Sequence, residues 1–351
     1  MRFPLQLKIL FGFALTLLPL VILTIREFRS DVARLERRVL EAQMITAGGV
    51  AAAVDRQLDT AIGLGWAVSL DPRVKRFDPV VVEAYLQELV QLTPFVTAIG
   101  VFDAQGECHA FATSTGIEGR GPSIGDRAYF QQVMAANQPA VSNVLALRTL
   151  PGTGIVAAVP IRDDTTGRAV GLVAVITDTH ALSRQYWERS TQAPGQAILL
   201  LDRDGRLAFH TADPDLPFEM ADAMRAFPPV VSALAGVPAT SASFTSPIAG
   251  DERLGAFTRT STHDWVVGVT VPREIALAPA YRHLRSELLA FGIILGFTIL
   301  LSVGFARFLV RPVRELQAAV RDLGRGDLSR RVAIRTGDEI EALAASFNKI
   351  T

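Results

Sequence analysis

The sequence lacks several features that stabilise or charge other classes of protein. It has a single cysteine, Cys108, in 351 residues, so no disulfide can form within the chain. Lysine plus arginine and aspartate plus glutamate both number 35, and the formal net charge is zero. No overall charge therefore favours a nucleic acid or an acidic partner, and we expect no nucleic-acid binding.

Signatures of catalysis are also missing. The chain has no G-x-S-x-G, H-E-x-x-H, phosphate loop or dinucleotide fingerprint. Asp202 and Asp204 resemble the start of a calcium loop, but Gly205 comes too early and no glutamate stands at the twelfth position, so a β-turn is the better interpretation. The histidines are scattered, none at metal-ligand spacing from another: His109, His180, His210, His263 and His283. We expect no enzyme activity, metal site or cofactor in this chain.

Two long apolar runs are present instead, at Ile9–Ile25 and Leu288–Val310. Each is close to the roughly 20 residues that cross a bilayer, and we predict transmembrane helices at 9–26 and 288–310. The first run resembles a signal peptide, but no small-x-small cleavage site follows it, which favours an uncleaved anchor. Arginines follow the second run, and positively charged residues beside a membrane span tend to stay in the cytoplasm. We therefore expect residues 1–8 and the C-terminal end in the cytoplasm.

The segment between the runs begins with a helical pattern and continues with β-rich texture. Apolar residues in 27–70 recur mostly at steps of three and four among charged residues, which predicts a long stalk helix that Asp71-Pro72 ends. Pro79–Leu92 is predicted to be a shorter helix. From there to about Pro272, short β-rich runs alternate with turn residues.

The β-rich part repeats itself. Phe95–Thr113 is a hairpin with a D-x-x-G turn, and Gly195–Thr211 repeats it. A second hairpin follows each copy, at Gly154–Asp178 and Glu252–Pro272, after a more helical stretch. These helical stretches are Asp126–Ala136 and Glu219–Leu234. We predict an α+β fold in which two modules with antiparallel sheets, 71–180 (membrane-distal) and 181–283 (membrane-proximal), follow the stalk helix.

This order of elements resembles the double-Cache (dCache) sensor domain of bacterial receptors and kinases, a tandem of PAS-like modules. The marks are the long helix, V-F-D-x-x-G, GDRAYFQQVMA, S-N-V after it, A-V-P-I before a D-x-x-G hairpin, and G-L-V-A-V-I. The resemblance covers about residues 35–272. It implies that a small molecule binds in the membrane-distal module, and we expect the proximal module to transmit rather than bind.

Candidate ligand contacts lie in the GDRAYF segment. Asp126 and Arg127 would begin a helix, with Tyr129 and Phe130 beside them. A planar, permanently charged guanidinium suits a carboxylate ligand, and the aromatic rings could form a pocket wall. An alternative is that Asp126 caps the helix and pairs with Arg127 without any ligand contact.

The resemblance implies the same site and adds an acidic residue late in the last strand of the module, matched here by Asp178. Arg148 is a further candidate. An arginine and an aspartate facing one cavity would suit a zwitterion such as an amino acid. The amino-acid-binding version of the family also carries Tyr-x-Asp on the next strand, where this chain reads AVSNVLALR. An organic acid, an amine or another small metabolite is therefore equally open.

Residues 311–351 form two amphipathic halves. Their apolar residues step by three and four, as at the a and d positions of a coiled coil: Val313, Leu316, Val320 and Leu323, then Ile340, Leu343, Phe347 and Ile350. Glycines separate the halves, and Val332 and Ile334 could fold back as connector anchors. Since each half is too short to be stable alone, two chains are predicted to pair as a parallel four-helix coiled coil.

This segment resembles a HAMP linker. Pro312 follows the membrane and opens P-V-x-x-L, a G-D-L turn lies at 326–328, Asp338-Glu339-Ile340 opens the second helix, and Phe347-Asn348 stands near its end. Glu341 departs from the family, which usually has glycine there.

We therefore expect a homodimeric, two-pass sensor of the bacterial inner membrane, with a periplasmic ligand-binding domain and cytoplasmic termini. Binding would be relayed through HAMP to a cytoplasmic output. The alternative is that the chain is the N-terminal part of a histidine kinase, a diguanylate cyclase or a methyl-accepting chemoreceptor whose output domain follows Thr351. A transport or adhesion accessory protein would have no use for the HAMP pattern.

Overall fold

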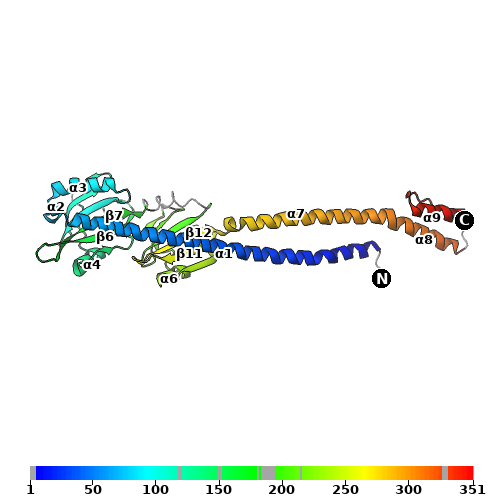
Figure 1. Cartoon of the computed structure of the whole chain (residues 1–351), viewed down its shortest axis with the longest axis horizontal. Coiled ribbons are helices and arrows are strands. Elements are labelled where there is room, and N and C mark those ends of the chain that lie inside the picture. Colours follow the sequence, from blue (N-terminus) through cyan, green and yellow to red (C-terminus); the bar gives the residue numbers. More distant parts are fainter. Residues whose placement is uncertain are drawn as a thin grey trace. The chain divides into compact units, whose positions relative to one another are not determined.

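The computed structural model describes residues 5–117, 121–148, 150, 152–179, 182, 194–213, 216–325 and 331–350. The chain divides into two compact units (Figure 1). One is Arg34–Ala278, and the other combines Met1–Ala33 with Pro279–Thr351. Each unit is described by itself.

Helix α1 (Leu5–Ser69) covers both the first predicted span and the predicted stalk. Its buried residues in the Arg34–Ala278 unit include Ala47, Ala51, Val54, Leu58 and Ala61. They recur at steps of four, three, four and three, which places them on one face of the helix. The short helix α2 (Pro72–Lys75) follows, and its first turn is capped by Asp71, whose Oδ1 accepts a hydrogen bond from the Arg73 N–H at 2.8 Å.

The first module is built on an antiparallel sheet in the order β3-β2-β1-β7-β6-β4, with β5 also paired to β6. Its strands are β1 (Ala98–Asp103), β2 (Cys108–Thr113), β3 (Gly116–Ile117), β4 (Ala140–Val141), β5 (Leu145–Ala146), β6 (Thr153–Arg162) and β7 (Ala169–Asp178). Helix α3 (Pro79–Leu92) has the predicted bounds and shares a core with α1 on one face, and α4 (Ala128–Ala136) packs in a core on the other. Strand β1 serves both cores by alternation, with Ile99 in the first and Phe102 in the second.

The second module has an antiparallel sheet in the order β10-β11-β12-β8-β9. Its elements are β8 (Ala197–Leu201), β9 (Leu207–His210), the 3-10 helix η1 (Phe218–Asp222), α6 (Pro228–Leu234), β10 (Ala239–Thr245), β11 (Glu252–Arg259) and β12 (Val266–Pro272). The α+β prediction, a long N-terminal helix with two antiparallel sheets, is confirmed. The exact boundary predicted between the modules, at 180/181, lies outside the described residues.

The two D-x-x-G turns have the same geometry. Asp103 Oδ1 accepts hydrogen bonds from the N–H groups of Gln105 and Glu107 at 2.9 and 3.0 Å. Asp202 Oδ1 accepts them from Asp204 and Arg206, both at 2.9 Å. A β-turn is thus the structure at Asp202, and no cluster of three metal-ligating side chains occurs among the described residues.

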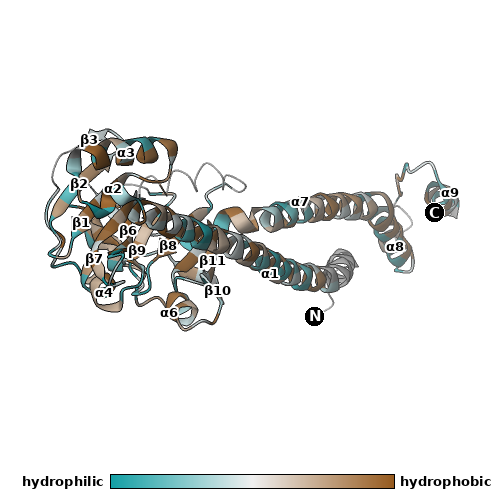
Figure 2. Cartoon of the chain, turned by 60° about the vertical axis from the view of Figure 1, so that its left-hand side comes forward, coloured by the Kyte–Doolittle hydropathy of each residue, from teal (hydrophilic) through white to brown (hydrophobic). Residues whose placement is uncertain are grey.

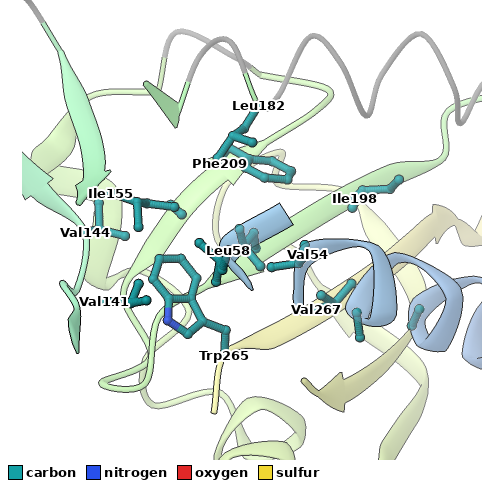
Figure 3. Packing of buried hydrophobic residues seen from close by; sticks show 14 of the residues in the cluster. Val54, Leu58, Val141, Val144, Ile155, Leu182, Ile198, Phe209, Trp265 and Val267 are labelled. Atoms are coloured by element: carbon teal, nitrogen blue, oxygen red, sulfur yellow. The ribbon is translucent and has the colours of Figure 1, made fainter. Parts of the chain in front are cut away.

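One apolar cluster joins α1 to both modules, and Figure 3 shows Trp265 among its neighbours. Its members come from α1 (Ala47, Ala51, Val54, Leu58), from the first module (Val141, Val144, Ile155, Leu182) and from the second (Ile198, Leu200, Ala208, Phe209, Trp265, Val267, Val269). Because all of these side chains are buried together, the face of α1 is the shared core of the two sheets.

The other unit contains the second predicted span. Helix α7 (Arg273–Phe305) continues through the π-helical turn η2 (Ala306–Val310) into α8 (Arg311–Leu323). Within the described part of the chain, this continuous helix is the one segment long and apolar enough to cross a membrane. Figure 2 shows the apolar colouring along α7, where Ile293 and Leu300 are 73% and 71% exposed. The side chains of residues 5–17 lie outside the described part, so the first span stays a prediction.

Helices α8 and α9 (Glu339–Ile350) pack on one another through an apolar cluster. Its buried members are Leu316, Ala319, Val332, Ile334, Ala344 and Phe347, with Leu323 and Ile340 at its edge. Burial of Val332 and Ile334 agrees with their predicted role as connector anchors. The predicted Gly326-Asp327-Leu328 turn and the Ile350 side chain lie outside the described residues.

The predicted coiled-coil stripe divides into two sets within a single chain. Pro312, Leu316 and Phe347 are buried, whereas Val313, Val320 and Leu343 are 50%, 52% and 58% exposed. The exposed set is apolar surface that one copy of the chain leaves uncovered.

The start of α9 explains the unusual Glu341. Asp338 Oδ1 accepts a hydrogen bond from the Ile340 N–H at 3.0 Å, and Glu341 Oε2 accepts one from the Gly337 N–H at 2.7 Å. Two N–H groups at the helix start are thereby satisfied, as in a capping box. The Thr336 hydroxyl bonded to Asp338 holds the pKa of that carboxyl below its usual range. Glu339, beside the cap, places a further negative charge in the first turn.

Replacing Trp265 by alanine tests the shared core. Trp265 is fully buried, so the Trp265→Ala cavity should lower the free energy of unfolding by about 3–5 kcal/mol. Trp265→Phe is the control, because the indole Nε1 has no hydrogen-bond partner among the described residues and phenylalanine keeps most of the contact. Thermal unfolding of the purified chain, followed by circular dichroism, measures both; similar melting temperatures for the alanine variant and the unmodified chain would contradict the shared core.

Candidate functional site

A hollow opens on the α4 side of the first module. About 400 Å³ of space lies between its walls and in the open solvent at its mouth, and the centre of a water-sized sphere can move through about 30 Å³ of this space. The sheet supplies Phe102, Phe111, Val156, Ala174 and Ile176, and the flanking segments supply Pro122, Ile124, Arg127, Tyr129, Leu145, Leu147 and Arg148. The hollow is therefore an apolar floor with two arginines and a tyrosine at its wall, which is the usual composition of a small-molecule site.

The two arginines are held differently. Arg148 makes a bidentate pair with Asp126, at 2.8 Å from Nη1 to Oδ1 and 2.5 Å from Nη2 to Oδ2, and also donates to the Ser123 carbonyl at 2.6 Å. This arginine holds the pKa of the Asp126 carboxyl below its usual range. Arg127 Nη2 donates to the Ala146 carbonyl at 3.1 Å, a neutral partner, and the Arg127 charge also helps to lower the pKa of the Asp126 carboxyl, less strongly than Arg148 does. Of the two, Arg127 is better placed to pair with an incoming anion.

Asp126 and Arg127 precede α4 rather than belong to it. The helix begins at Ala128, and Arg127 occupies the N-cap position without a side-chain cap bond. Asp126 pairs with Arg148, 22 residues away, and does not line the hollow. The alternative in which Asp126 caps the helix and pairs with Arg127 is therefore not the arrangement observed.

Tyr129 and Phe130 point to different surroundings. Tyr129 lines the hollow, and burial raises the pKa of its phenol to about 12, so it stays neutral at physiological pH and can donate a hydrogen bond. Phe130 is buried in the core under α4 with Val133 and is not among the lining residues.

Asp178 lies at the end of β7, opposite Gly154 of β6. Its backbone N–H donates to Thr97 Oγ1 at 3.0 Å. It is not one of the described residues that line the hollow. The structure therefore brings Arg127, Tyr129 and Arg148 together at the hollow and does not bring Asp178 to them.

Sequence reasoning missed most of the apolar wall. Leu145 and Leu147 come from the short β5 and the turn after it, where no helical or hairpin motif marked them. Ile124 is placed by a close approach of two loops, in which its N–H donates to the Gly106 carbonyl at 2.9 Å. A Cβ on Gly106, whose φ is +82°, would lie 2.4 Å from the Gly125 nitrogen. Only glycine permits that approach.

The second module has a smaller hollow of about 340 Å³, which also touches Thr153 and Thr179 of the first. One of its polar lining residues is His210, which is 2% exposed and whose Nδ1 has no partner among the described residues. Burial, with Arg253 nearby, lowers the pKa of His210 to about 4, so the ring is neutral at physiological pH. The two threonine hydroxyls bond to each other at 2.6 Å. No cationic side chain lines this hollow among the described residues.

Comparison with known protein families identifies the two parts of the chain. The Cache domain matches residues 30–280, and the HAMP domain matches residues 304–350.

Two curated relatives are similar to a part of the chain. The methyl-accepting chemotaxis protein PscA of Pseudomonas syringae pv. tomato is 34% identical over 90 residues, which are 25% of this chain and 14% of PscA. The methyl-accepting chemotaxis protein PctB of Pseudomonas aeruginosa is 34% identical over 89 residues, 24% of this chain and 14% of PctB. The matched part is a small fraction of either relative.

Solved structures share the fold. The periplasmic sensory domain of the Campylobacter jejuni chemoreceptor Tlp1 covers 70% of this chain and 99% of its own length, with a TM-score of 0.53 and 12% identity. An extracellular domain assigned to a histidine kinase, soHK1S-Z6, covers 71% and 99%, with a TM-score of 0.56 and 17% identity. The chain therefore belongs to the Cache-domain family, and it is a double-Cache (dCache) sensor domain followed by a HAMP domain that relays its signal.

Proposed function

We propose that this chain is the sensing and relay part of a two-pass receptor of the bacterial inner membrane, and that the first-module hollow binds a small organic carboxylate from the periplasm. The observation that supports this most strongly is that an apolar floor lies beside Arg127, whose guanidinium donates a hydrogen bond to the neutral Ala146 carbonyl. A carboxylate would receive a charge-assisted hydrogen bond from it, and bidentate geometry suits the guanidinium fork.

The lining favours a carboxylate over an amine or an amino acid. An ammonium group inside the hollow would need an acceptor, since a buried, unpaired charge is costly. No acidic residue is among the described residues that line the hollow, and the neighbouring Asp126 is already bound to Arg148 at both oxygens. The apolar floor suits a short hydrocarbon chain on the ligand, and the neutral Tyr129 phenol can donate to its oxygen.

The relay is proposed to run through a homodimer. Val313, Val320 and Leu343 are exposed in a single chain although they occupy the a and d pattern, and a second chain would bury them in a parallel four-helix coiled coil. Ligand can bias two packings of such a bundle only through its different affinity for the two states. We expect both termini in the cytoplasm and no catalysis in this chain.

The output is proposed to lie in a cytoplasmic partner or domain after Thr351. Methyl-accepting chemotaxis proteins are among the relatives that match a part of the chain, and a domain assigned to a histidine kinase shares the fold of its sensor. These findings favour a chemoreceptor or a histidine kinase. A diguanylate cyclase stays a third candidate. The reading frame downstream of codon 351 discriminates among them.

A ligand screen tests the binding site. Purified chain in nanodiscs should melt at a higher temperature with short monocarboxylates such as acetate, propionate or pyruvate, and not with the amines of matching length. Arg127→Gln removes the charge that pairs with the carboxylate and should weaken binding about 10- to 100-fold by isothermal calorimetry.

The matched control for that screen is Arg168→Gln, which removes the same charge from an exposed position before β7. It should leave the affinity unchanged. Stabilisation by amino acids or amines but not by carboxylates would contradict the ligand class, and equal affinities for Arg127→Gln and the unmodified chain would contradict the site.

Cysteine cross-linking tests the dimer. With Cys108→Ala as background, Leu343→Cys and Val320→Cys should form disulfide-linked dimers in oxidised membranes, because facing core positions bring Cα atoms within about 7 Å. Ala345→Cys, exposed on the other side of α9, is the control and should cross-link little. Equal yields at Leu343 and Ala345 would argue against a paired stripe.

A further inference from the structure

The turn Asp202–Gly205 between β8 and β9 of the second module, called here the Asp202 turn, reaches into the first module. Asp202 Oδ2 accepts a hydrogen bond from the Val144 N–H at 3.1 Å. Asp204 Oδ2 accepts one from Asn143 Nδ2 at 2.6 Å, and Arg203 Nη2 donates to the Val141 carbonyl at 2.7 Å. Three successive residues of the turn thus bond to one short stretch that begins at Val141, the last residue of β4, and ends at Val144.

That stretch continues directly into the wall of the first-module hollow. Residues 142–148, the wall segment, include Leu145, Leu147 and Arg148, which line the hollow. The same segment provides the Ala146 carbonyl that accepts from Arg127. One peptide bond separates the residue held by Asp202 from the first leucine of the wall, so the position of Val144 determines where the wall begins.

Asp202 is buried and its hydrogen bonds are specific. It is fully inaccessible to solvent, with Oδ1 occupied by its own turn and Oδ2 by Val144. The equivalent residue of the first module, Asp103, uses Oδ1 in the same way, but its Oδ2 bonds to His109 of its own hairpin at 2.8 Å. The contact across modules is therefore a property of the second turn and not of the repeated motif.

The wall segment has other attachments within its own module. The Ser142 hydroxyl accepts from the Val156 N–H at 2.9 Å, and Leu145 pairs with Gly154 of β6. The Val144 side chain is buried in the shared cluster of Figure 3. Loss of the Asp202 bond should thus loosen the segment locally without unfolding the module, since local openings cost less than global unfolding.

We propose that the Asp202 turn positions the wall segment of the ligand hollow, so that the second module sets the shape of the first module's site. By linkage, a ligand that moves the wall must also act on the β8–β9 hairpin. Strand β8 pairs with β12, which runs without a loop into α7. The role of the hollow as a carboxylate site rests on the proposed function, whereas the positioning of the wall does not.

Thiol labelling measures wall position without any ligand. In the full chain with Cys108→Ala, a cysteine at Leu147→Cys reports how often the wall opens. Asp202→Asn replaces one acceptor oxygen by a donor amide, and the labelling rate should rise about fivefold, as the loss of one buried hydrogen bond predicts. The Asp202→Asn substitution should also lower the affinity of the chain for propionate.

The matched control is Asp163→Asn. Asp163 caps the β6–β7 turn by accepting from the N–H groups of Thr165 and Thr166 at 3.1 and 2.7 Å, so its side chain bonds within its own turn and away from the wall segment. A general loss of stability would raise the labelling rate in both variants alike. An increase confined to Asp202→Asn supports positioning, and a labelling rate equal to that of the control would overturn it.

Two further outcomes of the experiment can be distinguished from one another. If Asp202→Asn does not fold, Asp204→Ala removes the acceptor of the Asn143 bond, and a rise in labelling of about twofold is expected from that single exposed contact; no change would overturn the proposal. If labelling rises but propionate never binds, the proposed ligand class fails and the positioning role stands.

Discussion

The fold depends on the burial of one helical face. The apolar residues of α1 between Ala47 and Ala61 recur at steps of four and three, and both modules pack on them. Removal of this much apolar surface from water is a large favourable contribution to folding. Because Trp265 and Ile155 meet on the same helix face, neither sheet completes its core without α1. The two copies of the module are therefore one compact unit and not two independent domains.

The two copies of the module differ in the hydrogen-bond partner of one carboxylate oxygen. Asp103 and Asp202 close their turns through the same Oδ1 bonds, yet the second carboxylate oxygen serves His109 in one copy and Val144 of the other module in the second. The hollows have diverged as well. The first is lined by two arginines and a tyrosine, the second by a neutral histidine and a pair of threonines bonded to each other. A common fold thus carries a hollow lined by two arginines in one copy, and in the other a hollow without arginine or lysine among its described lining residues.

Local sequence patterns predicted the architecture. They predicted less about the site, because the site depends on contacts between residues far apart in the sequence. Period and turn chemistry are sequence-local, so α1, the D-x-x-G hairpins, the bounds of α3 and the stripes of α8 and α9 follow from the residues themselves. The pairing of Asp126 with Arg148 joins residues 22 positions apart, and no local rule identifies it. Asp178 shows the same limit, because its place at the end of β7 depends on strand register against β6. Leu145 and Leu147 line the site from a segment without a motif, and their position depends on another module.

The junction between β12 and α7 has a geometric consequence. Pro272 is the last residue of the strand, and Arg273 is the first residue of the helix. No loop separates the two elements. Each residue of an α-helix advances by about 100° and 1.5 Å, so the register of β12 in its sheet sets the rotational phase of the first turns of α7, residues 273–278, which belong to the same unit. Arg273 reinforces that phase, because its guanidinium bonds to Glu36 of α1 at 2.8 Å. Within this unit, the side of these first turns that faces α1 is thus decided by the strand pairing next to Arg273.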